Sequence, residues 1–201
     1  NALGEFHFKA DKYNEALWEF LWVDAVFNGT VDSLTQRRVG LPIGPALIAR
    51  TLASVGGTLG ACRAALEEGI AGNLAGGTHH ALRDRGEGYC LFNDVAVAFL
   101  QLFEERRVSR VAIVDLDVHQ GNGNAEILGN DARIHILCMH GARNYPWHKV
   151  PTTQDVPLVD GTDDVTYLRL LDAALPAVWA HKPELLVYLA GVDPLNTDSL
   201  G

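Results

Sequence analysis

The sequence predicts an α/β protein with a central, mostly parallel sheet in three layers, and three observations support this. Short runs of branched apolar residues alternate with longer helical patterns, which is typical of a parallel α/β sheet. The 201-residue chain is 48% hydrophobic, which is enough for one buried core. No stretch rich in Pro, Gly or Ser divides it, so we expect a single domain over residues 1–201.

The first half of the chain is predicted to hold two helices with a weak strand between them. Residues 45–68 are rich in Ala and Leu and indicate a helix, which a glycine pair within it is expected to kink or interrupt. Residues 70–74 form a weaker strand candidate. Residues 93–106 begin with an Asn-Asp pair, a natural N-cap, and indicate the second helix.

The second half is predicted to supply the buried central strands of the sheet, at residues 110–118, 134–139 and 184–190. Each is short, rich in branched residues and followed by a polar or glycine-containing turn. Residues 163–180 open with paired aspartates and indicate a helix, in which Pro176 is expected to introduce a kink or a break.

Composition excludes several classes of function. Sixteen Lys+Arg against 25 Asp+Glu give a formal charge of −9 without a basic cluster, so we expect no nucleic-acid partner. No long apolar stretch or signal-peptide pattern occurs, so we expect a cytoplasmic protein without a membrane partner. The three cysteines form no CxxC pair and are odd in number, which favours a reducing compartment. The pattern predicts no particular oligomeric state.

Candidate metal ligands follow two of the predicted strands. Residues two apart on a strand project to the same face, so Asp117 and His119 can converge on one ion. Asp193 can supply a third ligand if the strands at 110–118 and 184–190 are neighbours. Two carboxylates and one imidazole favour Zn²⁺ or Fe²⁺, and three protein ligands leave a position open, as in catalytic sites. Taken alone, an Asp-x-His pair more often consists of polar turn residues than of metal ligands. The additional Asp193 favours the metal site.

A tandem histidine pair is the second candidate element. His79 and His80 follow two glycines, which allow the backbone to pass close to a site. One imidazole could act as a general base, and such a base needs a partner that fixes its tautomer. Asp115 and Asn122 are the candidate partners. A solvated pair of loop histidines is an equally common explanation of such a pattern on its own.

Several motifs then occur in the order and spacing of one family. They are GGTHHA (76–81), GEGYCLFNDVAVA (86–98), DLDVHQGNG (115–123), NYP (144–146) and AGVDPLNTDSLG (190–201). Together they resemble the histone deacetylase superfamily, most closely bacterial deacetylase-like amidohydrolases and the class IV type. The resemblance spans about residues 39–201, whereas the first thirty or so residues resemble the family only loosely.

The resemblance implies an arginase/deacetylase-like fold with one zinc ion at the end of a tunnel that fits an acyl-lysine. The implied reaction is hydrolysis of the amide of an acetylated amine, such as acetyl-lysine or an acetylpolyamine, in a small molecule or a peptide. By motif position, Asp117, His119 and Asp193 match the zinc ligands. Fe²⁺ is the alternative ion.

The resemblance also implies roles for the polar residues around the ion. His79 and His80 match the catalytic pair, with His80 as the general base. Asp115 would orient His79, and Asn122 stands where some members carry an Asp partner to the second histidine. Because Asn cannot carry a charge, we expect His80 to be less basic than in those members.

The tunnel wall and the substrate contacts are assigned by the same resemblance. Gly88 and Tyr89 match a motif of the tunnel wall, with Tyr89 in place of the commoner Phe, and Tyr145 of the NYP motif is assigned to substrate binding.

A monovalent cation such as K⁺ is a weaker expectation. Its site would use Asp115, the carbonyls of Asp117 and His119, and the segment Cys138-Met139, with Cys138 where a serine oxygen is often found.

The chain also departs from the family pattern, and we expect it to be incomplete at both ends. Members normally continue beyond Gly201 to a glycine-rich loop, where a tyrosine hydroxyl stabilises the oxyanion. At the other end, a strand and loop look omitted between Trp22 and Val23. If the oxyanion donor lay within the chain instead, Tyr145 and His140 would be the residues to test.

Two other functions remain as alternatives. A ureohydrolase shares the architecture but needs two manganese ions bridged by further aspartates, and only Asp198 follows Asp193 closely. A non-catalytic metal-binding domain that kept the pocket is the other alternative.

Overall fold

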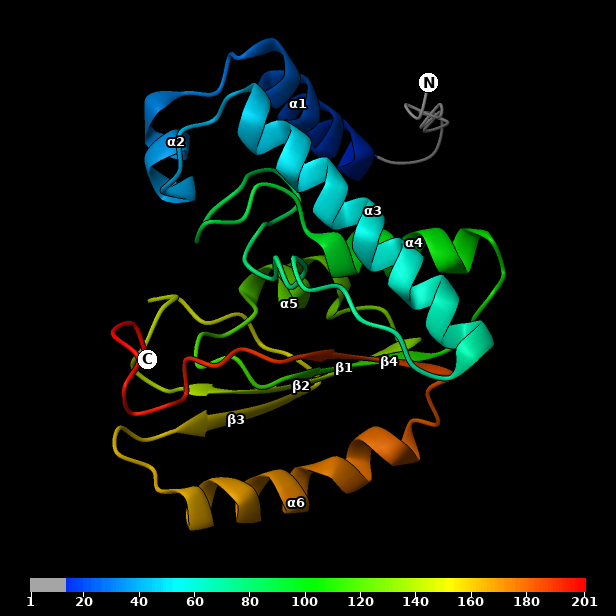
Figure 1. The fold of residues 1–201 in the computed structure, drawn as a ribbon, viewed down its shortest axis with the longest axis vertical. Helices are drawn as coiled ribbons and strands as arrows, with labels where there is room; N and C mark the ends of the chain where they lie inside the picture. The colour runs from blue at the N-terminus through cyan, green and yellow to red at the C-terminus, as the bar shows by residue number, and fades with distance from the viewer. Residues whose placement is uncertain (1–13) are drawn as a thin grey trace.

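The computed structural model describes residues 14–201, which form three layers with a sheet in the middle (Figure 1). The first thirteen residues of the predicted 1–201 domain lie outside the described part of the chain. The elements in order are α1 (Asn14–Asn28), α2 (Ser33–Val39), α3 (Pro45–Glu68), α4 (Asp94–Glu104), β1 (Val111–Asp115), α5 (Asn122–Leu128), β2 (Ile134–Gly141), β3 (Gln154–Leu158), α6 (Asp164–Ala180) and β4 (Leu185–Leu189).

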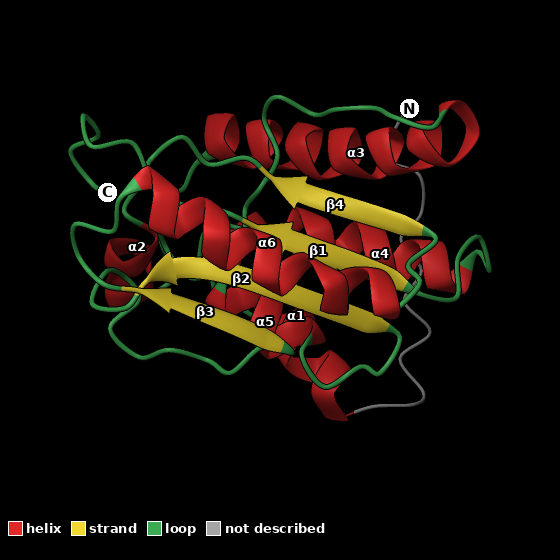
Figure 2. Cartoon of the chain, turned by 90° about the horizontal axis from the view of Figure 1, so that it is seen from below, coloured by secondary structure: helices red, strands yellow, loops and turns green. Residues whose placement is uncertain are grey.

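The sheet has the strand order β3-β2-β1-β4, and all neighbouring strands are parallel, as Figure 2 shows by the common direction of the arrows. In this register the last residue of β1, Asp115, lies beside Cys138 of β2 and Leu189 of β4. The carboxyl ends of β1 and β4 are therefore adjacent. This confirms the predicted parallel α/β fold and brings together the segments that carry the candidate ligands.

Both faces of the sheet are covered, by α6 on one side and by α3, α4 and α5 on the other (Figure 1). Ile113 of β1 packs with Phe99 of α4, whereas Val114 packs with Val178 of α6. Successive strand residues thus enter opposite cores, which explains why β1 is apolar along its whole length up to its last residue.

Two helices at the N-terminal end were not predicted. α1 and α2 form a smaller cluster in which Trp22, Val26 and Val39 pack against Leu91. The Trp22 indole Nε1 donates to the Leu91 carbonyl at 3.0 Å. Trp22 and Val23, where the sequence suggests an omitted strand, are consecutive residues within α1.

The weak strand at 70–74 is wrong, because this segment has no strand conformation. Ile70 is 84% exposed and Leu74 is fully exposed, so no neighbouring element covers them. The strand at 184–190 is also not central: β4 is the outer strand of the described sheet, and Tyr188 is largely exposed. The central strands are β1 and β2, and the strand β3 beyond them was missed.

The predicted interruptions of two helices are wrong as well. α3 runs unbroken through its glycine pair, and a Cβ added to Gly57 would come within 3.0 Å of the Asn73 side chain, so a small residue is needed there. α6 continues through Pro176 because hydrogen bonds on both sides and packing on β2 and β3 hold a helix of 17 residues. The helix starts were predicted correctly, with Asn93 and Asp163 as N-caps. None of the described helices is long and apolar enough to cross a membrane.

Candidate active site

The candidate ligands Asp117 and His119 lie on the turn after β1, at the carboxyl ends of the strands. The prediction that strand alternation aligns them is wrong, because β1 ends at Asp115. Turn hydrogen bonds align them instead. The His119 backbone N–H donates to Asp117 Oδ1 at 2.8 Å, and the Asp117 N–H donates to Asp115 Oδ1 at 3.2 Å.

Asp193 reaches the same place from the turn after β4. Its Oδ1 accepts the Val118 backbone N–H at 3.0 Å, which leaves Oδ2 directed at His119. The His119 Nδ1 lies 3.0 Å from Asp193 Oδ2 and 3.0 Å from Asp117 Oδ1. The approach requires Gly191, because a Cβ there would lie 2.6 Å from Asp117 Oδ2.

These three side chains fit a small divalent cation. One ligand atom of each lies within 4.8 Å of the others, and no second group of this kind occurs among the side chains that the structure describes. Tetrahedral zinc with bonds of ~2.0–2.1 Å needs ligand atoms about 3.3 Å apart, so the 3.0 Å from His119 Nδ1 to each carboxylate oxygen would have to lengthen by only a few tenths of an ångström. Burial and the neighbouring Asp117 charge raise the pKa of Asp193, a repulsion that a cation would remove. The donor set suits Zn²⁺ and equally Fe²⁺.

His79 is buried beside the ligand cluster and is held by a carboxylate. Its Nδ1 lies 2.7 Å from Asp115 Oδ2, and its Nε2 lies 3.9 Å from Asp117 Oδ1. Burial opposes the charged imidazole, but the Asp115 charge and hydrogen bond outweigh it and raise the pKa of His79 to about 9. His79 is therefore surrounded by carboxylates that favour its protonated form.

His80 has a different environment, although its ring centroid is only 4.1 Å from that of His79. Its Nδ1 lies 2.8 Å from Asn122 Oδ1, a neutral partner at the start of α5. Burial and then the neighbouring His79 charge lower the pKa of His80 to about 3, while the hydrogen bond to Asn122 acts in the opposite direction. The different surroundings of the two histidines thus give them very different pKa values.

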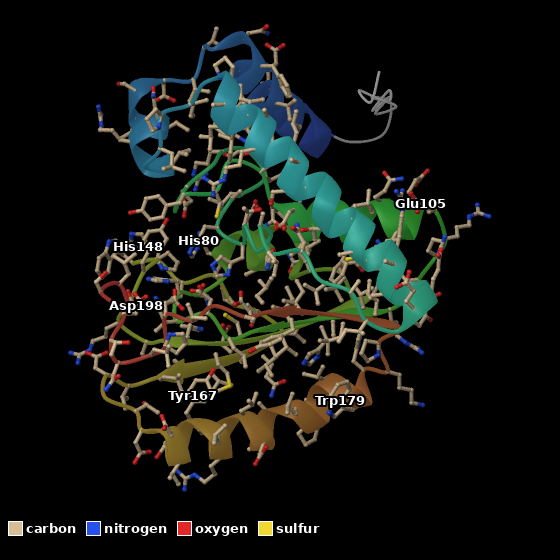
Figure 3. All side chains as sticks on the ribbon, viewed as in Figure 1. His80, Glu105, His148, Tyr167, Trp179 and Asp198 are labelled. Atoms are coloured by element: carbon tan, nitrogen blue, oxygen red, sulfur yellow. The ribbon has the colours of Figure 1, made fainter. Side chains whose placement is uncertain are left out.

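The loop that carries the histidines is fixed by Asp94, which the sequence indicated only as part of an N-cap. This fully buried carboxylate accepts the backbone N–H groups of Gly77 and Thr78 at 2.9 and 2.8 Å. It also accepts the hydroxyls of Thr58 and Thr78. Because an Asp in a first helical turn is common for electrostatic reasons alone, nothing in the sequence separated this one from the rest. The loop held in this way places His80 above the sheet, on the side where the strands end (Figure 3).

The residues predicted to line the tunnel are close to His80. Gly88 has φ +55°, and a Cβ there would lie 2.7 Å from the His80 ring, so only glycine fits. Tyr89 also has a positive φ and is largely exposed, with its ring against Gly40. The Tyr145 ring lies edge-on to His80 with the centroids 5.0 Å apart.

A neighbouring acid, Glu87, was not predicted as a site residue, although it lies inside a motif that the sequence analysis quoted. Its Oε1 accepts from Asn122 Nδ2 at 2.7 Å and from the Tyr145 hydroxyl at 3.0 Å. The Tyr145 hydroxyl is therefore already engaged, which argues against its use as an oxyanion donor in this conformation. His140, the other residue considered for that role, is buried in β2 with Nδ1 3.8 Å from Asp155 Oδ1.

The predicted monovalent-cation site stays a prediction. Asp115 and Cys138 face each other in the β1–β2 register, and both are buried. The Met139 side chain packs in the core under α6, so only its backbone could take part.

Comparison with known proteins relates the chain to one family. A family model described as a histone deacetylase domain matches residues 10–201. An uncharacterized protein of Picosynechococcus is 42% identical over 181 residues, 90% of this chain and 60% of that protein. "Histone deacetylase 2" of Arabidopsis thaliana is 43% identical over 151 residues, 73% of this chain and 39% of that protein.

A solved structure gives the same result for the fold. The acetylpolyamine aminohydrolase of Burkholderia pseudomallei superimposes with a TM-score of 0.68 at 26% identity, over 80% of this chain and 51% of that one. The chain thus spans only about 40–60% of the length of these relatives.

Proposed function

The chain belongs to the histone deacetylase family, and on that premise we propose that it acts as a zinc-dependent deacylase that hydrolyses the amide of an acetylated amine. The observation that carries the proposal is the convergence of Asp117, His119 and Asp193 beside two buried histidines with opposite pKa shifts. Pairs of titratable groups whose environments separate their pKa values are typical of acid–base sites.

A bound ion would supply chemistry that the side chains themselves do not. When bound by Asp117, His119 and Asp193, Zn²⁺ or Fe²⁺ would act as a Lewis acid that polarises the amide carbonyl and lowers the pKa of water towards ~7.

The protein's own residues would move the protons. The lowered pKa keeps the His80 imidazole neutral at pH 7, so its ring has a nitrogen free to serve as the acceptor for the proton of the attacking water. The leaving amine then needs a proton, which His80 returns. The high pKa of His79 makes it cationic before an ion binds, and Asp115 keeps its ring oriented towards the ligand cluster.

The ureohydrolase alternative finds less support. A second metal would need further carboxylates, but Asp198 is exposed, and its Oδ1 accepts the Leu200 N–H. Within the described residues, the three-residue group above is the one cluster of metal-ligand side chains.

Substrate class is tested by incubating zinc-loaded protein with an acetyl-lysine peptide, an acetylated polyamine and arginine. We expect acetate from one or both amides and no urea from arginine. Urea release with manganese would support the ureohydrolase instead. A metal-loaded protein that releases neither product would support the non-catalytic alternative.

A further inference from the structure

Glu87 is a charged residue next to the histidine pair that the proposed reaction has not used. Its side chain is only 14% exposed, between Asn122 and Tyr145. The Arg85 guanidinium lies beside it, with Nε 3.6 Å from Glu87 Oε2, which is longer than either hydrogen bond to Oε1. The carboxylate is therefore directed mainly at the side chains that contact His80.

The Asn122 amide joins Glu87 to His80. Its nitrogen donates to Glu87 Oε1 at 2.7 Å, and its oxygen lies 2.8 Å from His80 Nδ1. An amide group has nearly the same shape in either orientation, so its neighbours determine which end faces which group. If it were reversed, Asn122 Oδ1 and Glu87 Oε1 would face each other as two acceptors at hydrogen-bond distance.

A carboxylate only accepts hydrogen bonds, so Glu87 selects the amide nitrogen and leaves the oxygen for His80. That oxygen also only accepts, so His80 Nδ1 must donate a proton to it. In a neutral imidazole the other nitrogen, Nε2, then carries the lone pair. The Glu87 charge thus sets the orientation of the Asn122 amide, and the amide sets which nitrogen of the His80 ring carries the proton.

We propose that Glu87 is a positioning residue that acts through Asn122 to hold His80 in the tautomer with Nδ1 protonated and Nε2 free. The catalytic value of this tautomer rests on the proposed function, since a general base needs its free nitrogen on the side of the attacking water. The tautomer itself can be measured without any reaction.

The primary test is the nitrogen-15 NMR spectrum of the histidine rings, recorded at pH 7 on the protein without added metal. His80 is assigned by its absence in a His80→Gln variant. We expect the wild type to show the Nδ1–H form at His80. In Glu87→Ala the amide is free to turn, and a second population with Nε2–H should appear. Glu87→Gln can present either its oxygen or its nitrogen to Asn122, so its share of the Nε2–H form should lie between those of the wild type and Glu87→Ala.

Asn122→Asp supplies the decisive control. Both oxygens of the carboxylate that this substitution introduces accept hydrogen bonds, so the variant needs no help to select the Nδ1–H form. Glu87→Ala combined with Asn122→Asp should therefore show only that form. Tyr145→Phe, which removes the other donor to Glu87 Oε1, should leave the tautomer unchanged.

Activity provides a second readout. Glu87→Ala should lower kcat by about 10- to 100-fold with little change in KM, as is typical for residues that orient a catalytic group. Adding Asn122→Asp to Glu87→Ala should restore at least part of the lost kcat, because a carboxylate at position 122 takes over the orienting role once Glu87 no longer faces it. A purely structural role for Glu87 would leave the double variant as slow as Glu87→Ala.

The outcomes separate this inference from the proposed function. An unchanged His80 tautomer in Glu87→Ala, or an Nε2–H form in the wild type, would overturn it. If Glu87→Ala does not fold, Glu87→Met also lacks the acceptor and is interpreted in the same way. A tautomer shift in a protein that releases no acetate would support the inference while contradicting the deacylase.

Discussion

The two halves of the site are held in different ways. The ligand half, Asp117, His119 and Asp193, lies on turns after β1 and β4, and its side chains are 15–21% exposed and bonded to one another. The histidine half, His79 and His80, is almost fully buried and is tied to groups on other elements. The ligand half can therefore adjust to an ion, whereas the histidine half is preorganised before any ion binds.

The largest expected effect is on the ligand half. Asp117→Ala or Asp193→Ala should abolish metal binding, because only two ligands would remain where a tight site needs three. Elemental analysis of the purified variants measures this. Asp198→Ala, which changes an exposed carboxylate five residues after Asp193, is the matched control and should retain one ion per chain. Two ions in the wild type would contradict the one-metal site.

The next effect concerns the histidine half. His80→Ala should lower kcat by about 10²- to 10⁴-fold, because a general base is lost, while the metal content stays near one. Steady-state kinetics and metal analysis on the same sample measure both quantities. His181→Ala, at the C-cap of α6, is the control and should keep its activity. Metal loss in proportion to activity would mean that His80 is a ligand instead of a base.

A third effect is on the support of the histidine loop. Asp94→Ala should lower the free energy of unfolding by ~3 kcal/mol, because it leaves the buried N–H groups of Gly77 and Thr78 without an acceptor. Urea denaturation measures the change. Asp164→Ala, also at the first residue of a helix but exposed, should lower it by less than about 1 kcal/mol. Equal losses in both variants would mean that Asp94 acts only through the helix dipole.

The smallest effect is expected at Tyr145, whose hydroxyl already donates to Glu87. Tyr145→Phe should lower kcat by less than about tenfold, whereas loss of an oxyanion donor costs roughly 10²- to 10³-fold. A fall in that larger range would identify Tyr145 as the donor and would contradict the role given to its hydroxyl here.

The ligand half was easier to predict from sequence than the support of the histidine half. Parallel strands bring their carboxyl ends to one edge, so Asp117, His119 and Asp193 could be placed together from their positions after strands. The alignment of Asp117 and His119 was attributed to the strand, because strand ends are poorly defined by sequence. Turn hydrogen bonds provide it instead.

The residues that support the histidine half, Asp94 and Glu87, were missed because their contacts are long-range. Asp94 lies 16 and 17 residues from the N–H groups that it accepts, and Glu87 lies 35 residues from Asn122. No local pattern distinguishes such carboxylates from solvated ones. The wrong strand at 70–74 has a related cause, since apolar residues alone do not reveal whether a neighbouring strand exists to pair with them.

A zinc titration of metal-free protein tests most directly whether one metal ion serves a hydrolytic site. Acetate release from an acetylated amine is measured after each addition. We expect the rate to rise in proportion to zinc and to level off at one equivalent per chain. A rate that continues to rise to two equivalents, or no acetate with one equivalent bound, would contradict it.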